Sequence, residues 1–335
     1  MFFYKRVVVA ASIALLAAAV PACGSDDSTS GGSGTGASAS GGGGDAIKLG
    51  FAQVGAESGW RTANTTSIQD SAKQAGIDLK FSDAQQKQEN QIKAIRSYIQ
   101  QKVDVIAFSP VVESGWDAVL NEAKRANIPV ILTDRAVDSK DTSLYKTFLG
   151  SDFVKEGNEA GEWAVKEFAD AKEVNIAELQ GTTGSAPAVD RKQGFTDIIS
   201  KDPKFKITQS QTGEFTRAKG KEVMEAFLKS GKKIDLLFAH NDDMALGAIE
   251  AIEGAGLKPG KDIKIVSIDA VKDGMTALSE GKINYIVECN PLLGPQLMEL
   301  VKKVKAGESV PARVETQETA FDQAAAKTAL PSRQY

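Results

Sequence analysis

Cysteine and histidine are scarce in this chain, which has two cysteines and one histidine among 335 residues. Two cysteines cannot build a disulfide framework, so the folded part must be held together by its hydrophobic core. A single histidine, His240, cannot build a metal site, and no other group of candidate ligands has the spacing for one. We interpret His240 as a structural residue.

The signatures of several functional classes are also missing. No Gly-x-Ser-x-Gly turn is present, and residues 181–184 lack the lysine and the spacing of a phosphate-binding loop. The 40 basic and 44 acidic residues give a net charge of -4 and form no basic stripe, which argues against a nucleic-acid partner. With 42% hydrophobic and 25% charged residues, the composition is that of a soluble globular protein.

The first residues predict export. Lys5 and Arg6 precede an uninterrupted run of small and apolar residues, Val7–Val20, which is shorter than the ~20 residues of a membrane-spanning helix. Such a run is typical of a secretory signal. Residues 20–23 read Val-Pro-Ala-Cys and resemble the lipobox of bacterial lipoproteins, in which cleavage leaves the cysteine as a lipidated N-terminus. An ordinary signal peptide with an incidental cysteine is the alternative.

We therefore expect a signal peptide over residues 1–22, a lipidated Cys23, and a flexible tether, mainly of Gly and Ser, up to residue 44. The lipid would anchor the exported protein to the outer face of the cell membrane, in a periplasm or at an extracytoplasmic surface. With Cys23 lipidated, Cys289 has no partner in the chain.

From Ile47 onward, short apolar segments alternate with amphipathic ones, which is typical of βαβ units and a parallel sheet. The first half predicts strands over residues 47–54, 77–81, 103–108 and 128–133, and helices over 61–75, 88–101 and 116–126. The second half predicts strands over residues 174–179, 207–211, 235–239 and 263–268, and helices over 189–200, 217–229, 243–255 and 271–279. Two successive halves of similar size indicate two doubly wound domains. A single (β/α)₈ barrel is the alternative.

Polar side chains are concentrated where the predicted strands end, which is the edge at which open α/β sheets bind ligands. These strand ends are residues 55–61, 133–135, 180–184, 240–243 and 267–269. They carry carboxylates, guanidinium groups, an amide and an indole. Aspartate and asparagine also cap helices, and we interpret Asp242 in that way. Five polar ends together indicate a binding site at this edge of two sheets.

Several of these segments resemble a known family. The motifs DAQQKQENQ (83–91), LTDR (132–135), DRKQGF (190–195) and HNDDM (240–244) are similar to those of periplasmic sugar-binding proteins of the ribose-binding class. The segments QVGAESGWR (53–61) and FTRAKGKEVME (215–225) are similar to the galactofuranose-binding type of that class, which serves bacterial ABC importers. The similarity extends from Ile47 to about Asn290 and weakens beyond it.

The resemblance implies an α/β fold of the periplasmic-binding-protein type I, with two doubly wound parallel-sheet domains joined by a three-stranded hinge. The hinge crossings are then expected near residues 150–152, near 288–290 and between 306 and 313. The N-terminal domain is expected to comprise residues 45–151 plus 290–307, and the C-terminal domain residues 152–289 plus 308–335.

The resemblance also implies ligand residues, position by position. The class implies Asp134, Arg135, Arg191, Asn241 and Asp269, and its galactofuranose-binding type implies Glu57, Arg61 and Glu288. Trp60 and Phe215 match the aromatic positions that sandwich the sugar ring, and a place in the core is the alternative for both. We interpret Trp116 and Trp163 as packing residues. A sugar presents hydroxyls and an apolar C–H face, so charged side chains and aromatic rings suit it.

The implied function is that of a substrate-binding lipoprotein. It would bind a monosaccharide, a furanose such as galactofuranose, between its domains and deliver it to the permease subunits of an ABC importer. It would act as a monomer, without a cofactor or a metal. A secreted glycosidase that uses Glu57, Asp134 and Asp269 is the rival interpretation. Each of these carboxylates has a candidate arginine nearby, which would keep it ionised and therefore a poor general acid, so we expect no enzyme.

Overall fold

The computed structural model describes residues 46–335, which contain both halves of the predicted α/β pattern. The predicted signal peptide over 1–22, the lipidation site Cys23 and the tether up to residue 44 lie outside the described residues. Within residues 46–335, no helix combines the length and the apolar character needed to cross a membrane.

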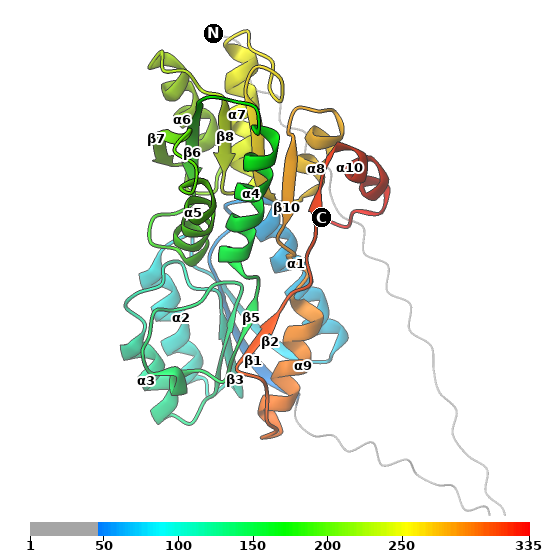
Figure 1. The fold of residues 1–335 in the computed structure, drawn as a ribbon. Coiled ribbons are helices and arrows are strands. Elements are labelled where there is room, and N and C mark those ends of the chain that lie inside the picture. Colours follow the sequence, from blue (N-terminus) through cyan, green and yellow to red (C-terminus); the bar gives the residue numbers. More distant parts are fainter. Residues whose placement is uncertain (1–45) are drawn as a thin grey trace, which may run out of the picture. The chain divides into compact units, whose positions relative to one another are not determined.

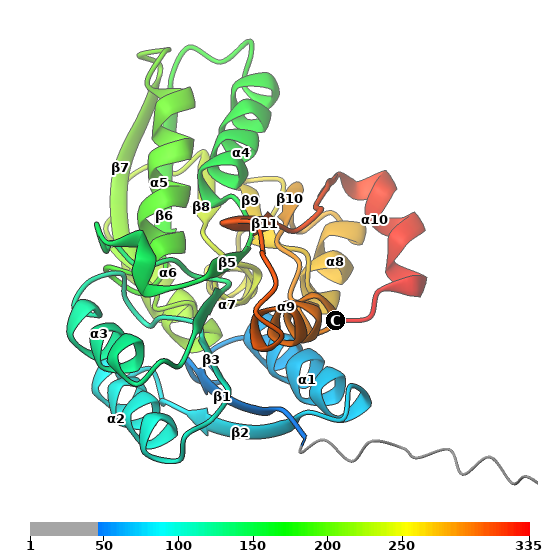
Figure 2. The same cartoon turned by 90° about the horizontal axis from the view of Figure 1, so that it is seen from below.

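The first sheet has six parallel strands in the order β11-β5-β4-β3-β1-β2. Its strands are β1 (Lys48–Gln53), β2 (Asp78–Asp83), β3 (Val105–Phe108), β4 (Val130–Thr133), β5 (Thr147–Gly150) and β11 (Arg313–Glu315). Helices α1 (Gly59–Gln74) and α9 (Gly294–Lys305) pack on one face, and α2 (Gln88–Gln100) and α3 (Asp117–Arg125) on the other, as Figure 2 shows. A 3₁₀ turn, η1 (Thr142–Leu144), precedes β5. We call this sheet and its helices the first lobe.

The second sheet has the order β12-β10-β9-β8-β6-β7 and is parallel except for the antiparallel pair β10–β12. Its strands are β6 (Val174–Gln180), β7 (Phe205–Thr212), β8 (Leu236–Ala239), β9 (Lys264–Asp269), β10 (Tyr285–Glu288) and β12 (Ala320–Phe321). Helices α4 (Phe153–Glu167) and α5 (Ala186–Ile199) cover one face. The other face carries α6 (Arg217–Lys229), α7 (Asp242–Gly254), α8 (Lys272–Ser279), α10 (Gln323–Ala329) and the 3₁₀ turn η2 (Leu330–Ser332). We call this sheet and its helices the second lobe (Figure 1).

The central strands are almost wholly apolar because helices cover both faces of each sheet. The four residues of β3, of β4 and of β8 are all buried. Successive side chains point to opposite faces, so in β1 Phe51 packs toward α1 and α9 while Ala52 packs toward α2 and α3. Two separate sheets confirm the predicted fold class and exclude the single barrel.

Every strand and helix predicted from the sequence is present, with ends shifted by at most three residues. The helix α6 has the predicted bounds. The elements that the sequence analysis missed are β5, α4, β10, α9, β11, β12 and α10, together with the two 3₁₀ turns.

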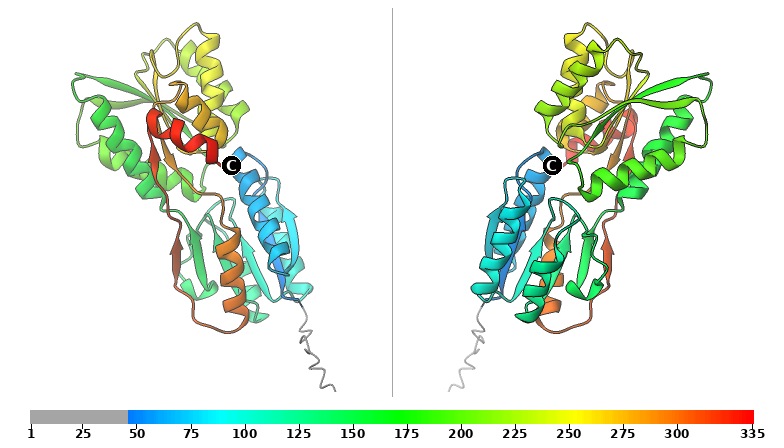
Figure 3. Two further views of the ribbon diagram at one scale, coloured as in Figure 1. Left: turned by 90° about the vertical axis from the view of Figure 1, so that its right-hand side faces the viewer. Right: turned by 90° about the vertical axis from the view of Figure 1, so that its left-hand side faces the viewer.

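The chain passes between the lobes three times, after β5, after β10 and after β11 (Figure 3). The third passage corrects the sequence analysis. Strand β11 pairs with β5 in the first sheet, so residues 313–315 belong to the first lobe. The predicted crossing between residues 306 and 313, and with it the assignment of residues 308–315 to the C-terminal domain, is therefore wrong. The passage follows Glu315 instead.

Polar side chains join these three passages to one another. Ser151 lies in the first passage, and its hydroxyl hydrogen-bonds the hydroxyl of Thr316 at 3.1 Å and the Glu318 carboxylate, both in the third. Glu318 also accepts a hydrogen bond from the backbone of Asn290, in the second passage, at 2.9 Å. The three linking segments are therefore bonded together next to the space between the lobes.

Candidate functional site

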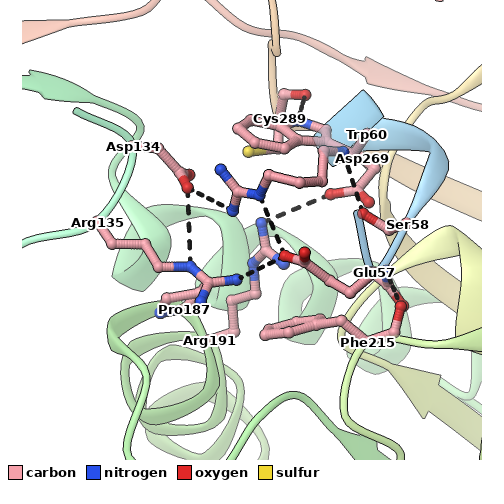
Figure 4. A pocket seen from close by; sticks show the side chains of 12 residues that line it. Glu57, Ser58, Trp60, Asp134, Arg135, Pro187, Arg191, Phe215, Asp269 and Cys289 are labelled. Carbon is pink, nitrogen blue, oxygen red and sulfur yellow. Dashed lines mark hydrogen bonds and ion pairs between the residues drawn. The ribbon is translucent and has the colours of Figure 1, made fainter. Parts of the chain in front are cut away.

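A small cavity lies between the lobes, where strands of both sheets end. Its lining includes nine of the ten residues predicted to bind ligand, and Figure 4 shows them converging on one space. The first lobe contributes Glu57, Trp60, Arg61, Asp134 and Arg135. The second lobe contributes Arg191, Phe215, Asn241 and Asp269.

The first turn of α1 directs two of these side chains into the cavity. Ser58 has an extended backbone and caps the helix, since its hydroxyl accepts a hydrogen bond from the backbone of Arg61 at 3.1 Å. The indole of Trp60 donates a hydrogen bond to the carbonyl of Cys289 at 2.6 Å, in the second passage between the lobes. The guanidinium of Arg61 lies 4.7 Å from the centre of the Trp60 ring. The indole is thus fixed in orientation by a partner at the hinge.

Two carboxylates and two guanidinium groups of the first lobe form a buried charge cluster. Arg61 contacts Asp134 at 2.6 Å and Glu57 at 3.1 Å. Arg135 contacts Glu57 at 3.4 Å and Asp134 at 3.7 Å. The side chains of Glu57, Asp134 and Arg135 point toward one another in Figure 4. Burial would raise the pKa of Asp134, but the two arginines outweigh it and lower that pKa. Asp134 is therefore ionised at neutral pH.

The second lobe presents one guanidinium between two carboxylates. Arg191, on α5, contacts Glu156 at 2.7 Å and Asp269 at 3.7 Å, and it donates a hydrogen bond to the carbonyl of His240 at 2.6 Å. Burial raises the pKa of Asp269 well above its usual value, and Arg191, at 3.7 Å, does not offset this. A further hydrogen-bond donor that enters the cavity would therefore stabilise the ionised form of Asp269.

Some buried polar atoms around the cavity lack a hydrogen bond within residues 46–335. Oε2 of Glu57 and Nε of Arg135 are buried and make no hydrogen bond within the described residues. One is an acceptor and the other a donor. Unpaired buried polar atoms cost free energy, so a ligand that offers both a donor and an acceptor is stabilised here.

Three of the lining residues have left-handed or otherwise rare backbone conformations. The φ angle is 60° at Asp134, 62° at Phe215 and 125° at Asp269. Such conformations cost about 1–3 kcal/mol each and are common at binding sites. The Phe215 ring lies against the backbone of Gly181, since a Cβ added there would overlap the ring. The position of the Phe215 ring therefore depends on the glycine that follows β6.

Residues 49–309 match the periplasmic binding protein domain. The chain belongs to the periplasmic binding protein family. The galactofuranose-binding protein YtfQ of Escherichia coli is 50% identical over 271 residues, which are 80% of this chain and 85% of YtfQ. The resemblance found in the sequence is thus confirmed, and membership of this family places the chain among exported proteins.

Two solved structures are similar over most of the chain. A structure from Mycobacterium smegmatis in complex with β-D-fucofuranose is 67% identical, with a TM-score of 0.85, and the match covers 87% of this chain and 96% of that one. The binding protein of the arabinose ABC transporter from Shewanella sp. ANA-3, bound to α- and β-L-arabinofuranose, is 50% identical, with a TM-score of 0.82. That match covers 86% of this chain and 95% of the other.

Glu288 is the one predicted ligand residue that the structure of this periplasmic binding protein places elsewhere. Its carboxylate accepts hydrogen bonds from Arg333 at 2.7 Å, from Tyr335 at 2.8 Å and from the backbone of Thr319 at 3.1 Å. Side chains alternate along an extended strand, so Glu288 points to the C-terminal segment while the next residue, Cys289, lines the cavity. The prediction of Glu288 as a ligand residue is corrected accordingly.

The predicted role of Asp242 also needs correction. Asn241 caps α7, since its side chain accepts a hydrogen bond from the backbone of Met244 at 3.0 Å. Asp242 is buried behind the cavity, where it accepts hydrogen bonds from Ser267 and from the backbone of Val271 at 2.9 Å. It thus connects α7 to the start of α8 instead of capping its own helix.

The interpretations of the other residues agree with their positions. His240 is buried and contacts Glu178 at 3.2 Å, and Trp116 packs against Phe108 with ring centres 4.9 Å apart. Trp163 stacks on Tyr285. The sequence analysis missed three lining residues, Ser58, Pro187 and Cys289. Ser58 lies in a strand end that was singled out, whereas nothing in the sequence distinguished Pro187 or Cys289.

Proposed function

We propose that this chain is the substrate-binding protein of an ABC importer and that it binds a monosaccharide in the furanose form between its lobes. One observation carries the proposal: a buried polar cavity is lined from both lobes. It holds an acceptor, Glu57 Oε2, and a donor, Arg135 Nε, that make no hydrogen bond to the part of the chain that the structure describes. Sugar hydroxyls both donate and accept, so one ligand can satisfy both atoms. Trp60 and Phe215 add apolar surface for the C–H face of the ring.

The ligands of the relatives narrow the proposed substrate class. D-Galactose, D-fucose and L-arabinose have the same configuration at the carbons of the furanose ring and differ only in the exocyclic group. That group carries two hydroxyls in galactose, and one in fucose and in arabinose. Proteins similar to this chain bind galactofuranose, fucofuranose and arabinofuranose, as their names state. We therefore propose recognition of this ring, with tolerance at the exocyclic carbon.

The proposed mechanism is closure of the two lobes on the sugar, followed by delivery to permease subunits. The charge cluster of the first lobe and Arg191 with Asp269 of the second face the same cavity. A sugar that contacts both sets binds the closed form more tightly than the open form, and this difference in affinity drives closure. The three bonded passages between the lobes are where the chain must bend.

Titration calorimetry against a panel of free monosaccharides tests the proposal. We expect binding of D-galactose, D-fucose and L-arabinose, and at least tenfold weaker binding of D-glucose and D-ribose, whose ring configurations differ. Carbon-13 NMR of labelled bound sugar should give the anomeric signal of a furanose. Binding of none of the first three sugars, or a pyranose signal, contradicts the proposal.

A separate assay tests the absence of catalysis. The proposed role is binding without chemical change, so prolonged incubation with 4-nitrophenyl furanosides of D-galactose and L-arabinose should release no nitrophenol. Release of nitrophenol would favour the glycosidase. Asp134, held ionised by its arginines, is a poor general acid, which supports the binding role.

We also propose that the exported protein is anchored by lipid at Cys23, on the basis of the sequence Val-Pro-Ala-Cys at residues 20–23. Replacing Cys23→Ser should leave the precursor unprocessed by the lipoprotein pathway and remove the lipid from the protein. Metabolic labelling with a fatty acid, with Cys289→Ser as the control, measures this directly. A wild-type protein that takes up no label would show that the cysteine is incidental.

A further inference from the structure

The two lobes touch directly beside the cavity, through contacts that do not involve its predicted ligand residues. The backbone N–H of Gly59, in the first lobe, donates a hydrogen bond to the Asp243 carboxylate of the second lobe at 2.8 Å. A second contact joins the backbone of Glu113, in the first lobe, to the carbonyl of Gly184, in the second, at 2.9 Å. Only the first of these involves an ionisable side chain.

Asp243 binds the N-terminus of a helix that belongs to the other lobe. Gly59 is the first residue of α1, and the first N–H groups of a helix have no partner within it. Ser58 satisfies the N–H of Arg61, and Asp243 satisfies that of Gly59. The N-terminus of a helix also carries a partial positive charge, so a carboxylate there is favourable. Hydrogen bond and dipole therefore act together across the space between the lobes.

The Asp243 carboxylate is held in place within its own lobe. It lies in the first turn of α7, and its other oxygen lies 3.5 Å from the guanidinium of Arg217. Asp243 is 7% exposed. It is absent from the lining of the cavity, although its neighbour Asn241 belongs to it. The side chain is thus aimed at the first lobe without lying at the sugar position.

We propose that Asp243 is a positioning residue that stabilises the closed arrangement by binding the N-terminus of α1. This inference rests on the proposed function, in which closure retains the sugar. Because an opened protein cannot make this contact, its loss should speed opening and release and leave the encounter of sugar with the open form unchanged. Asp243 would thereby set the lifetime of the complex for every sugar the site accepts.

Gly59→Pro removes the donor and leaves Asp243 intact. Proline is favoured at the first position of a helix, and the extended backbone of Ser58 (φ −147°, ψ 164°) is compatible with a following proline. Its ring carbon occupies the place of the lost hydrogen and displaces the carboxylate. Asp243→Asn removes the negative charge of the acceptor and leaves the Gly59 donor in place. The control is Asp117→Asn, which neutralises an exposed aspartate in the first turn of α3.

Stopped-flow release of L-arabinose and D-galactose measures the effect. We expect both variants to release each sugar about tenfold faster than the wild type, which corresponds to ~1.4 kcal/mol, with association rates within twofold. The factor should be equal for the two sugars, because the contact does not touch them. In the double variant, Asp243→Asn should add less than twofold to Gly59→Pro, since both remove one interaction. The control should release sugar at the wild-type rate.

Three results would overturn the inference. They are wild-type release rates in both variants, additive effects of the two substitutions on the release rate of the double variant, or faster release of only one of the two sugars. A lower melting temperature with unchanged release would indicate a purely structural role and would also overturn it. If the wild type binds no sugar of the panel, the proposed function fails by itself. The closed arrangement would then exist without sugar, so small-angle scattering of the ligand-free proteins decides. Gly59→Pro should enlarge the radius of gyration, and an unchanged radius would refute the role of Asp243.

Discussion

Replacing Arg191 by alanine is expected to weaken sugar binding by at least two orders of magnitude in a protein that still folds. Arg191 contacts Glu156 at 2.7 Å and Asp269 at 3.7 Å, and its removal leaves Asp269 at the cavity without a counter-charge. Breaking such a buried pair costs about 3–5 kcal/mol, or roughly two to four decades in the dissociation constant. Calorimetric titration of the variant with the best-binding sugar gives this number.

A control variant removes an arginine from an exposed ion pair. Arg96→Ala removes an exposed arginine that contacts Glu122 in two places, and such surface pairs contribute little to stability. This control should bind sugar as the wild type does. Binding by Arg191→Ala within about threefold of the wild type, well under the tenfold that 1.4 kcal/mol would give, would mean that Arg191 makes no essential contact in the site.

Gly157→Ala is expected to lower the free energy of unfolding by about 3 kcal/mol. Gly157 lies where α4 crosses α5. A Cβ there would approach the backbone nitrogen of Phe195 to 2.8 Å and the backbone oxygen of Arg191 still more closely. Backbone atoms cannot rotate away, so the helices must move apart. Because Arg191 is on α5, sugar binding should weaken as well.

A matched substitution in α7 separates this packing effect from helix propensity. A Cβ at Gly254 would have no neighbour within 4 Å, so Gly254→Ala should change stability by about 0.5–1 kcal/mol in the favourable direction. Urea unfolding of the two variants and the wild type compares them. Stability of Gly157→Ala within about 1 kcal/mol of the wild type, well short of the expected loss, would show that the two helices separate at little cost.

The glycines at the contact between α4 and α5 also explain why the sequence analysis missed α4. Gly157 and Gly161 lower the helix propensity of residues 153–167, because glycine disfavours an isolated helix. In the folded protein, tertiary packing outweighs that cost, because only glycine lets the backbones approach so closely. Helix α6 carries one glycine, Gly220, and a threonine cap at Thr216, and its bounds were predicted correctly. The packing that offsets the two glycines of α4 comes from a neighbouring helix, which local propensity does not include.

The candidate site was more accessible to prediction than these elements, for a geometric reason. Strands of a parallel sheet end at the same edge, so polar residues at positions such as 241 and 269, which lie at the ends of the neighbouring strands β8 and β9, must converge once the strands are assigned. The direction of a single side chain at a strand end does not follow from that rule. Glu288 and Cys289 differ by one position, and the alternation of the strand sends only Cys289 to the cavity. The pairing of Glu288 with Arg333 depends on a distant segment that the sequence pattern did not place.

The nearly balanced charges around the cavity determine what kinds of sugar derivative the site accepts. Glu57 and Asp134 are matched by Arg61 and Arg135, and Arg191 serves the acidic groups of the second lobe. A phosphate or a carboxylate on the sugar would enter this buried space without a free cationic partner, which costs several kcal/mol. We therefore expect the cavity to discriminate against sugar phosphates and uronic acids.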